Sequence, residues 1–221
     1  KVTLDETESQ HAVKVLRLAQ GDSIMLFDGK GGKYTCEIEQ PHHKKCVVKI
    51  ISKELIPNRS YRLHIAMAPT KMNDRYEWFL EKATEIGIHE ITPIICDRSE
   101  RKVINPERFE KIILSAMKQC NQMFLPKLNP AISLKEFIKR ENSGEKLIAH
   151  CEETNKKYLK SILKAKTDYT ILIGPEGDFS NKEIELALEN NYIPVSLGET
   201  RLRTETAAIV ACHSVVFINE D

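Results

Sequence analysis

The chain has 221 residues, with 33 Lys and Arg against 32 Asp and Glu, a formal net charge of +1, and 41% hydrophobic residues. This composition excludes intrinsic disorder, because it supplies enough apolar surface to build a core. No run approaches the roughly 18 apolar residues of a membrane span, and residues 1–10 are too polar for a signal peptide. We therefore expect a soluble, cytoplasmic protein of two unequal domains.

The cysteines and histidines form no pattern typical of a metal site. The six cysteines are scattered without a C-x-x-C pair, and the seven histidines include no pair spaced by four residues. Zinc sites usually need such closely spaced ligands. We expect reduced, mostly buried thiols and no bound metal.

The N-terminal part of the chain has the pattern of a small β structure. Short apolar runs at 24–27, 34–38 and 46–51 are separated by Gly-rich and Pro-containing turns. A short helix is expected before them, over 8–18, where apolar residues recur at helical spacing. The polar stretch 52–60 is the expected linker. The first domain is thus predicted over 1–55, and the absence of an initiator Met leaves open a further strand before Lys1.

From residue 60 to 221, predicted strands alternate with longer helices. This alternation is typical of an α/β domain with a largely parallel sheet. The helix starts carry recognisable signals: Asn105-Pro106 is a cap followed by proline, and Ser133-x-x-Glu136 and Ser180-x-x-Glu183 are capping boxes. We expect strands at 63–67, 91–96, 169–173 and 192–197, and helices at 74–86, from 105, from 133, from 180 and over 205–218. The last helix is apolar nearly all round, so we expect it to be buried.

Two loops that follow predicted strands form the candidate site, 174–180 and 198–206. In open α/β sheets, ligands bind beyond the carboxyl ends of the strands. Glycines in such loops let a flat ligand approach the main chain. Neither loop has the glycine pattern of a dinucleotide or P-loop phosphate site. The spacing alone leaves open that the first loop is only a tight turn and that Thr204 is only a helix cap.

Several motifs give the chain a resemblance to a known family. Ile-Gly-Pro-Glu-Gly occurs at 173–177, Leu-Gly at 197–198 and Leu-Arg-Thr-Glu-Thr-Ala at 202–207. Together with segments 11–17 and 81–87, they closely resemble the 16S ribosomal RNA uridine-N3 methyltransferases of the RsmE type.

The resemblance implies a fold, a cofactor and partners. The fold is a SPOUT-type α/β domain whose C-terminal segment forms a trefoil knot holding S-adenosyl-L-methionine. A small PUA-like β-barrel for RNA binding precedes it. The family also implies a homodimer that acts on 16S rRNA or on the 30S subunit.

The same resemblance assigns roles to individual residues. Cofactor contacts are expected at Ile173, Gly174, Gly177, Leu197, Gly198, Leu202, Thr204 and Ala207. RNA contacts are expected at Arg17, Lys71, Arg75 and Gln119, although solvated surface charge is the alternative for each single cation. Trp78 could stack on a base, whereas Phe79 is expected in the core.

Methyl transfer to N3 of uracil requires loss of the N3 proton. Arg203 is the candidate for stabilising charge on the uracil carbonyls, and Glu205 or Glu176 for accepting the proton. The structural alternatives are an ion pair of Arg203 with one of these carboxylates and a helix-capping role for Glu205.

The sequence departs from the family pattern at two places. Asp178 stands where the family usually has glycine, and Asn121-Gln122 replace a small residue and an arginine. Aspartate tolerates positive φ better than most residues, so we expect cofactor binding to survive. The role of the missing arginine could pass to Lys118 or Lys127. These departures leave open a non-catalytic RNA-binding or ribosome assembly factor, and a related enzyme with another target nucleotide is a weaker alternative.

Overall fold

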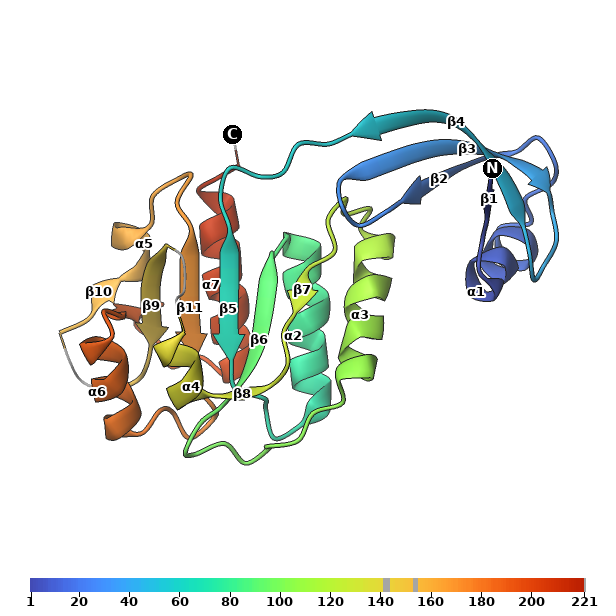
Figure 1. Cartoon of the computed structure of the whole chain (residues 1–221). Helices are drawn as coiled ribbons and strands as arrows, with labels where there is room; N and C mark the ends of the chain where they lie inside the picture. The colour runs from blue at the N-terminus through green and yellow to red at the C-terminus, as the bar shows by residue number, and fades with distance from the viewer. Residues whose placement is uncertain (141–143, 153–154, 221) are drawn as a thin grey trace. The chain divides into compact units, whose positions relative to one another are not determined.

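The chain was analysed as a computed structural model that describes residues 1–140, 144–152 and 155–220. It divides into two compact units, Lys1–Asn58 and Arg59–Asp221 (Figure 1). Among the described residues, no helix is both long enough and apolar enough to cross a membrane.

The first unit is built on a four-stranded antiparallel sheet. Its strands, in spatial order, are β1 (Val2–Thr3), β4 (Val47–Leu55), β3 (Gly32–Gln40) and β2 (Ser23–Phe27). Asp28 closes the hairpin between β2 and β3, because its Oδ1 accepts hydrogen bonds of 2.8 Å from the amides of Lys30 and Gly32. The expected linker at 52–60 begins too early, since β4 extends to Leu55. Polar composition did not reveal this, because residues 52–55 pair with β3 although they are exposed.

The helical segment of this unit also differs from the prediction. Helix α1 (Glu6–Gln10) starts two residues earlier than expected, because the side chain of Asp5 caps the amide of Glu8 at 2.8 Å. The chain then continues as a π-helix, η1 (His11–Val15). Arg17, just beyond it, has a φ of 56°. Single π-turns and left-handed non-glycine residues occur frequently at functional positions.

The second unit contains a sheet in which every strand pair is parallel, as predicted. The central order is β12-β9-β11-β5-β6, with the short strands at the two edges. The strands are β5 (Leu63–Met67), β6 (Glu90–Ile95), β7 (Lys127–Leu128), β8 (Ile132–Ser133), β9 (Glu145–Ala149), β10 (Lys157–Tyr158), β11 (Tyr169–Ile173) and β12 (Ile193–Ser196). The helices are α2 (Asn73–Ile86), α3 (Pro106–Gln119), α4 (Leu134–Lys139), α5 (Leu159–Ile162), α6 (Asn181–Glu189) and α7 (Thr204–Phe217).

Helices cover both faces of this sheet (Figure 1). Leu63, Ile65 and Met67 of β5 face the cluster formed with α2, α3 and α7. Ala66 and Ala68, on the other face, pack with residues of α4 and α6. The period of two in β5 therefore builds two cores.

The predicted helix signals act as expected at the described helix starts. Asn105 accepts from the amide of Arg108 at 3.1 Å, and Ser180 and Glu183 form a complete capping box. Gly87, with a φ of 107°, ends α2. The candidate cap Thr204 is an exception, because it is the first residue of α7 and Arg203 holds the cap position without a side-chain bond.

Helix α7 is buried on one side only, which corrects the prediction. Ala208, Ala211 and Val215 are fully buried, whereas His213 is exposed and Phe217 is 63% exposed. Composition could not show this, since an apolar helix leaves its covered side undetermined. The cysteines agree with expectation: all six are free, four are buried, and Cys151 is exposed.

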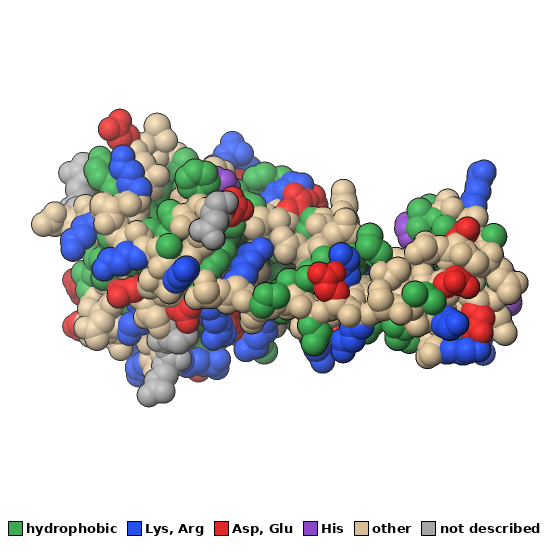
Figure 2. Space-filling model, turned by 90° about the horizontal axis from the view of Figure 1, so that it is seen from above, with side chains coloured by type: hydrophobic (Ala, Val, Ile, Leu, Met, Phe, Trp, Pro, Cys, Tyr) green, Lys and Arg blue, Asp and Glu red, His purple; other side chains and the backbone are tan. Residues whose placement is uncertain are grey.

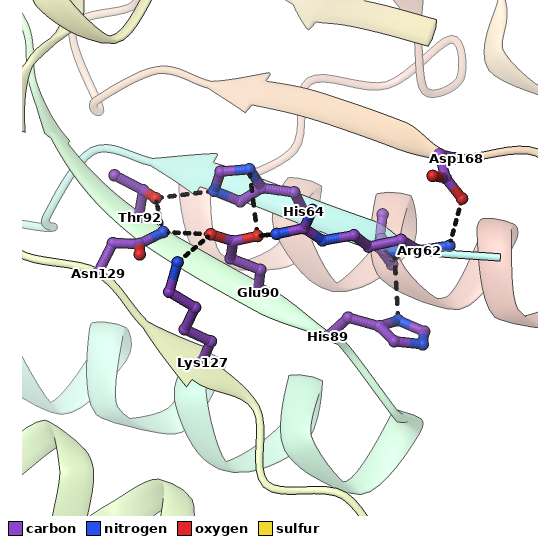
Figure 3. A network of polar contacts seen from close by, with 9 residues as sticks. Arg62, His64, His89, Glu90, Thr92, Lys127, Asn129 and Asp168 are labelled. Atoms are coloured by element: carbon purple, nitrogen blue, oxygen red, sulfur yellow. Dashed lines mark hydrogen bonds and ion pairs between the residues drawn. The ribbon is translucent and has the colours of Figure 1, made fainter. Parts of the chain in front are cut away.

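At the amino end of the sheet, polar side chains, some buried and some exposed, pair with one another (Figure 3). Glu90, only 5% exposed, accepts hydrogen bonds from Arg62, from Lys127 at 3.2 Å and from Asn129 at 2.7 Å. His64 shares a 2.7 Å hydrogen bond with Thr92. This Glu90 network lines a hollow of about 350 Å³.

Candidate functional site

A cavity of about 320 Å³ opens at the carboxyl end of the sheet. It lies between the loop after β11 and the segment that leads into α7, so the two predicted loops meet. Its size is typical of a small-molecule site. The lining residues are Ala149, Cys151, Ile173, Gly174, Pro175, Glu176, Asp178, Arg201, Leu202, Arg203, Thr204 and Ala207.

The cavity brings together most, but not all, of the predicted site residues. Five predicted cofactor residues line it, together with two of the catalytic candidates: Ile173, Gly174, Leu202, Thr204, Ala207, Glu176 and Arg203. Gly177, Leu197, Gly198 and Glu205 do not line it.

The glycines of the two loops are needed for different reasons. A Cβ at Gly174 would lie 3.0 Å from the ring of Phe179, so the ring and the backbone are already in close contact. Gly198 has a φ of 153°, which L-residues rarely adopt, and a Cβ there would meet nothing within 4 Å. The first glycine is required by packing and the second by its backbone conformation.

Asp178, the first departure from the family pattern, is accommodated by the loop. It adopts the predicted positive φ, at 62°. Its Oδ1 accepts from the amide of Phe179 and its Oδ2 from the amide of Cys151, both at 2.8 Å. The carboxylate therefore connects the loop after β11 to the segment after β9.

Two arginines that the sequence analysis missed hold the loops in place. Arg98 Nη1 donates to the carbonyl oxygens of Gly177 at 2.9 Å and Phe179 at 3.2 Å. Arg101 donates through Nη2 to the carbonyl oxygen of Lys71 at 2.9 Å. Their only sequence signal is their position just after β6, at the same edge of the sheet as the two glycine loops.

Glu176 joins two of the loops at the carboxyl end of the sheet, the loop after β11 and the loop after β5. Its Oε1 accepts a 2.9 Å hydrogen bond from the backbone amide of Lys71, in the loop after β5. The side chain of Glu176 lines the cavity, so the loop after β5 lies against the cavity wall.

The other two catalytic candidates have different environments. Glu205 is in the first turn of α7, 7% exposed, and its Oε1 lies 3.8 Å from Arg75 Nε. Its Oε2 has no hydrogen-bond partner among the described residues. Arg203 is exposed and forms no ion pair in the described part of the chain, so the predicted pair with Glu205 or Glu176 is not found.

The RNA-binding candidates do not form one cluster. Lys71 and Arg75 lie in and after the loop that follows β5, and Lys71 Nζ is 2.9 Å from Glu100. Gln119 ends α3, at the opposite end of that helix from the carboxyl-end loops (Figure 1). Arg17 belongs to the first unit.

The second departure, Asn121-Gln122, acts at the end of α3. Asn121 has a φ of 53°, and the amide of Gln122 donates to the carbonyl oxygen of Met117 at 3.0 Å. This is the geometry of a helix C-terminus, in which asparagine can replace glycine. Nearby on α2, Phe79 is fully buried as predicted, and Trp78 is 43% exposed.

Comparison with known protein families defines the class. Residues 57–216 match the family model described as RNA methyltransferase domain, and residues 4–51 match that of the RNA methyltransferase PUA domain. The chain therefore contains an RNA methyltransferase domain, preceded by a PUA domain of the kind found in RNA methyltransferases.

Individual relatives show which family of RNA methyltransferases the chain belongs to. The chain is 32% identical to ribosomal RNA small subunit methyltransferase E of Rickettsia conorii, over 97% of this chain and 89% of that protein. A probable rRNA-methyltransferase from Porphyromonas gingivalis is 40% identical, with a TM-score of 0.92 over 98% of this chain and 93% of that one. A Legionella pneumophila putative methyltransferase, solved in complex with bound SAM, is 33% identical, with a TM-score of 0.86 over 97% and 90%. The chain belongs to the ribosomal RNA small subunit methyltransferase E family, as the motifs predicted.

Proposed function

We propose that the chain transfers a methyl group from S-adenosyl-L-methionine to N3 of one uridine in 16S rRNA. The observation that carries the proposal is the carboxyl-end cavity, which is formed by the two loops that bear the family motifs. The same reaction would place the protein in the cytoplasm with its ribosomal substrate.

The cavity fits this cofactor in size and in chemistry. Ile173, Leu202 and Ala207 supply apolar surface for an adenine ring or a methionine chain, while the loop backbone supplies polar groups. The residues proposed to hold the cofactor are Ile173, Gly174, Gly177, Leu197, Gly198, Leu202, Thr204 and Ala207. When bound, the cofactor supplies an electrophilic methyl group with a neutral thioether as leaving group.

The chain must orient uracil and remove its N3 proton. Arg203 lines the cavity and is exposed, so its guanidinium can stabilise negative charge on a uracil carbonyl oxygen. Glu176 also lines the cavity, and it is the favoured proton acceptor. Glu205 is the alternative, because its buried Oε2 has no partner among the described residues.

RNA would be bound by both units. We assign residues 1–55 to a PUA-like RNA-binding barrel and 60–221 to the methyltransferase domain. The exposed Arg17, in its left-handed conformation after a π-helix, supports an RNA contact in the first unit. Lys71 and Arg75 are the corresponding cations near the cavity, and Gln119 is the least supported member of this group because of its place at the far end of α3.

A homodimer and a C-terminal trefoil knot complete the proposal. Exposed Phe217 and His213 on α7 offer a surface that a second copy can cover. The path of the chain supports the knot, because β12 lies beyond β9 while the following α7 returns to pack on β5 and β11.

Incubation with labelled cofactor and small subunits that lack the modification tests the proposal. We expect one methyl group at N3 of a single uridine, mapped by mass spectrometry of nuclease fragments. RNA binding without transfer would instead identify a non-catalytic assembly factor, and a methyl group at another position would identify a different enzyme of the same fold.

A further inference from the structure

Another hollow lies at the loop after β6, outside the carboxyl-end cavity that we propose holds the cofactor. It measures about 420 Å³ and is lined by Lys71, Glu100, Arg101, Lys102 and Val103. Three cations face one carboxylate there, although the whole chain carries a net charge of only +1. We call this hollow the basic groove. A local excess of cations of this kind attracts anions.

One of its three cations is held in place by the backbone. The guanidinium of Arg101 donates to the carbonyl oxygens of Thr70 at 3.2 Å and Lys71 at 2.9 Å. Because this side chain is already ordered, an anion would bind it with little further loss of conformational entropy. Lys71 Nζ lies 2.9 Å from Glu100 Oε2 in an ion pair that is exposed to solvent. Lys102 is exposed and makes no hydrogen bond or ion pair with any residue that the structure describes.

The basic groove shares a wall with the cofactor cavity. The amide of Lys71, which lines the groove, donates to Glu176, which lines the cavity. On its other side the groove continues into a larger hollow of about 600 Å³, because Arg101 and Val103 line both. Glu77, Glu107 and Arg108 also line that hollow, so the excess of cations is confined to the basic groove.

We propose that the basic groove binds a backbone phosphate of the substrate RNA next to the target nucleotide. This inference rests on the proposed function, because a base that enters the cavity brings its flanking phosphates to the adjoining surface. Phosphate contacts fix register and orientation without reading sequence. Lys71, Arg101 and Lys102 would hold the strand while the base is turned into the cavity.

Salt-dependent RNA binding by the full chain tests this proposal. The probe is a fluorescently labelled fragment of 16S rRNA, titrated at several salt concentrations into wild type, Lys102→Ala and Lys102→Glu. The matched control is Lys164→Ala, an exposed lysine just before β11 at the amino end of the sheet. Loss of one phosphate contact lowers the slope of log affinity against log salt by about 0.7 to 0.9.

We expect Lys102→Ala to bind about fivefold to tenfold more weakly than wild type at 0.1 M salt, with that reduced slope. Lys102→Glu should bind more weakly still, and Lys164→Ala should match wild type. Cofactor affinity, measured by calorimetry, should be the same in all four proteins.

The experiment distinguishes failure of the basic-groove proposal from failure of the proposed function. If both Lys102 variants keep the affinity and slope of Lys164→Ala, the basic groove does not bind RNA, whether or not methyl transfer is observed. If wild type binds RNA but transfers no methyl group, the proposed function fails while the slopes still decide the groove. If wild type does not bind the RNA fragment at all, the basic-groove proposal is wrong, and the methyl-transfer assay on small subunits decides the proposed function separately.

Discussion

The two ends of the parallel sheet use charged side chains in different ways. At the amino end, the side chains of the Glu90 network bind one another across β5, β6 and the start of β7 (Figure 3). At the carboxyl end, Arg98 and Arg101 bind backbone carbonyl oxygens of neighbouring loops. Pairing between side chains satisfies the carboxylate of Glu90 within its own network. The hydrogen bonds from Arg98 and Arg101 to the backbone fix the loops at the carboxyl end. Groups such as Lys102 and Glu205 Oε2 remain available there for a ligand.

The difference separates stability from ligand binding within one sheet. Strand order alone does not predict it, since both ends carry polar side chains and hollows of similar size, about 350 and 320 Å³. On the face seen in Figure 2, positive and negative side chains are interspersed, so no extended field of one sign distinguishes that face. What distinguishes the Glu90 network from Arg98 and Arg101 is the partner of each charge, which is another side chain in the first case and a backbone carbonyl oxygen in the second. Changes at the amino end should therefore affect folding, and changes at the carboxyl end should affect binding.

Glu90→Ala should have the largest effect, on stability alone. The carboxylate is buried, and its removal leaves Arg62, Lys127 and Asn129 without their acceptor. Loss of one partner of a fully buried ion pair costs about 3 to 5 kcal/mol, and we expect about 2 kcal/mol because Arg62 and Lys127 are partly exposed. Urea unfolding measures the change. An equal loss of cofactor affinity in the folded variant would contradict the separation between the two ends.

Gly198→Val should have the opposite effect to Glu90→Ala, because it should act on cofactor binding. Valine does not adopt a φ of 153°, so the loop must move, and strain of this kind costs on the order of 1 to 3 kcal/mol. We expect cofactor affinity to fall at least tenfold in calorimetry. Gly21→Val is the matched control, because Gly21 also has a positive φ, 89°, and open space around its Cβ but lies in the first unit. Unchanged affinity in Gly198→Val would remove this loop from the site.

Arg98→Lys should have a smaller effect at the same end. Lysine keeps the charge but lacks the rigid fork that reaches two carbonyl oxygens. We expect cofactor affinity to fall about fivefold, equivalent to roughly 1 kcal/mol, with little change in the urea midpoint. Arg108→Lys serves as control, since Arg108 pairs with Glu77 on the surface away from the cavity. A stability loss without an affinity change would mean that Arg98 only supports the fold.

The sequence allowed the regular parts of the fold to be predicted, because they depend on local signals. Period-two residues in β5 and the caps at Asn105 and Ser180 act within a few residues of themselves. The end of β4 was missed, since residues 52–55 pair with β3 although they are exposed and mostly polar. The one-sided burial of α7 was missed for a similar reason, because its covered face is set by β5, β11 and α2.

The candidate site was predictable only where residue type carries the information. The glycine motifs pointed to two loops, and the structure joins these around one cavity. Arg98 and Arg101 could not be found in this way, because their partners are backbone carbonyl oxygens, which every residue has. The Glu90 network was equally hidden, since its members lie far apart in sequence and look like ordinary surface charges.

The smallest predicted effect uses pH to test the amino end. Burial, opposed by Glu90 and assisted by the nearby cations Arg62 and Lys127, lowers the pKa of His64 to about 4. The unfolded chain, with an ordinary histidine pKa near 6.5, therefore binds a proton before the folded protein does. This difference destabilises the fold progressively from about pH 6.5 down to pH 4, and the loss should reach about 0.8 kcal/mol by pH 6. Urea unfolding of wild type and His64→Gln at pH 7.5 and pH 6 isolates this contribution, because glutamine cannot titrate but can still bond Thr92. A wild-type stability loss that persists unchanged in His64→Gln would show that other groups carry it.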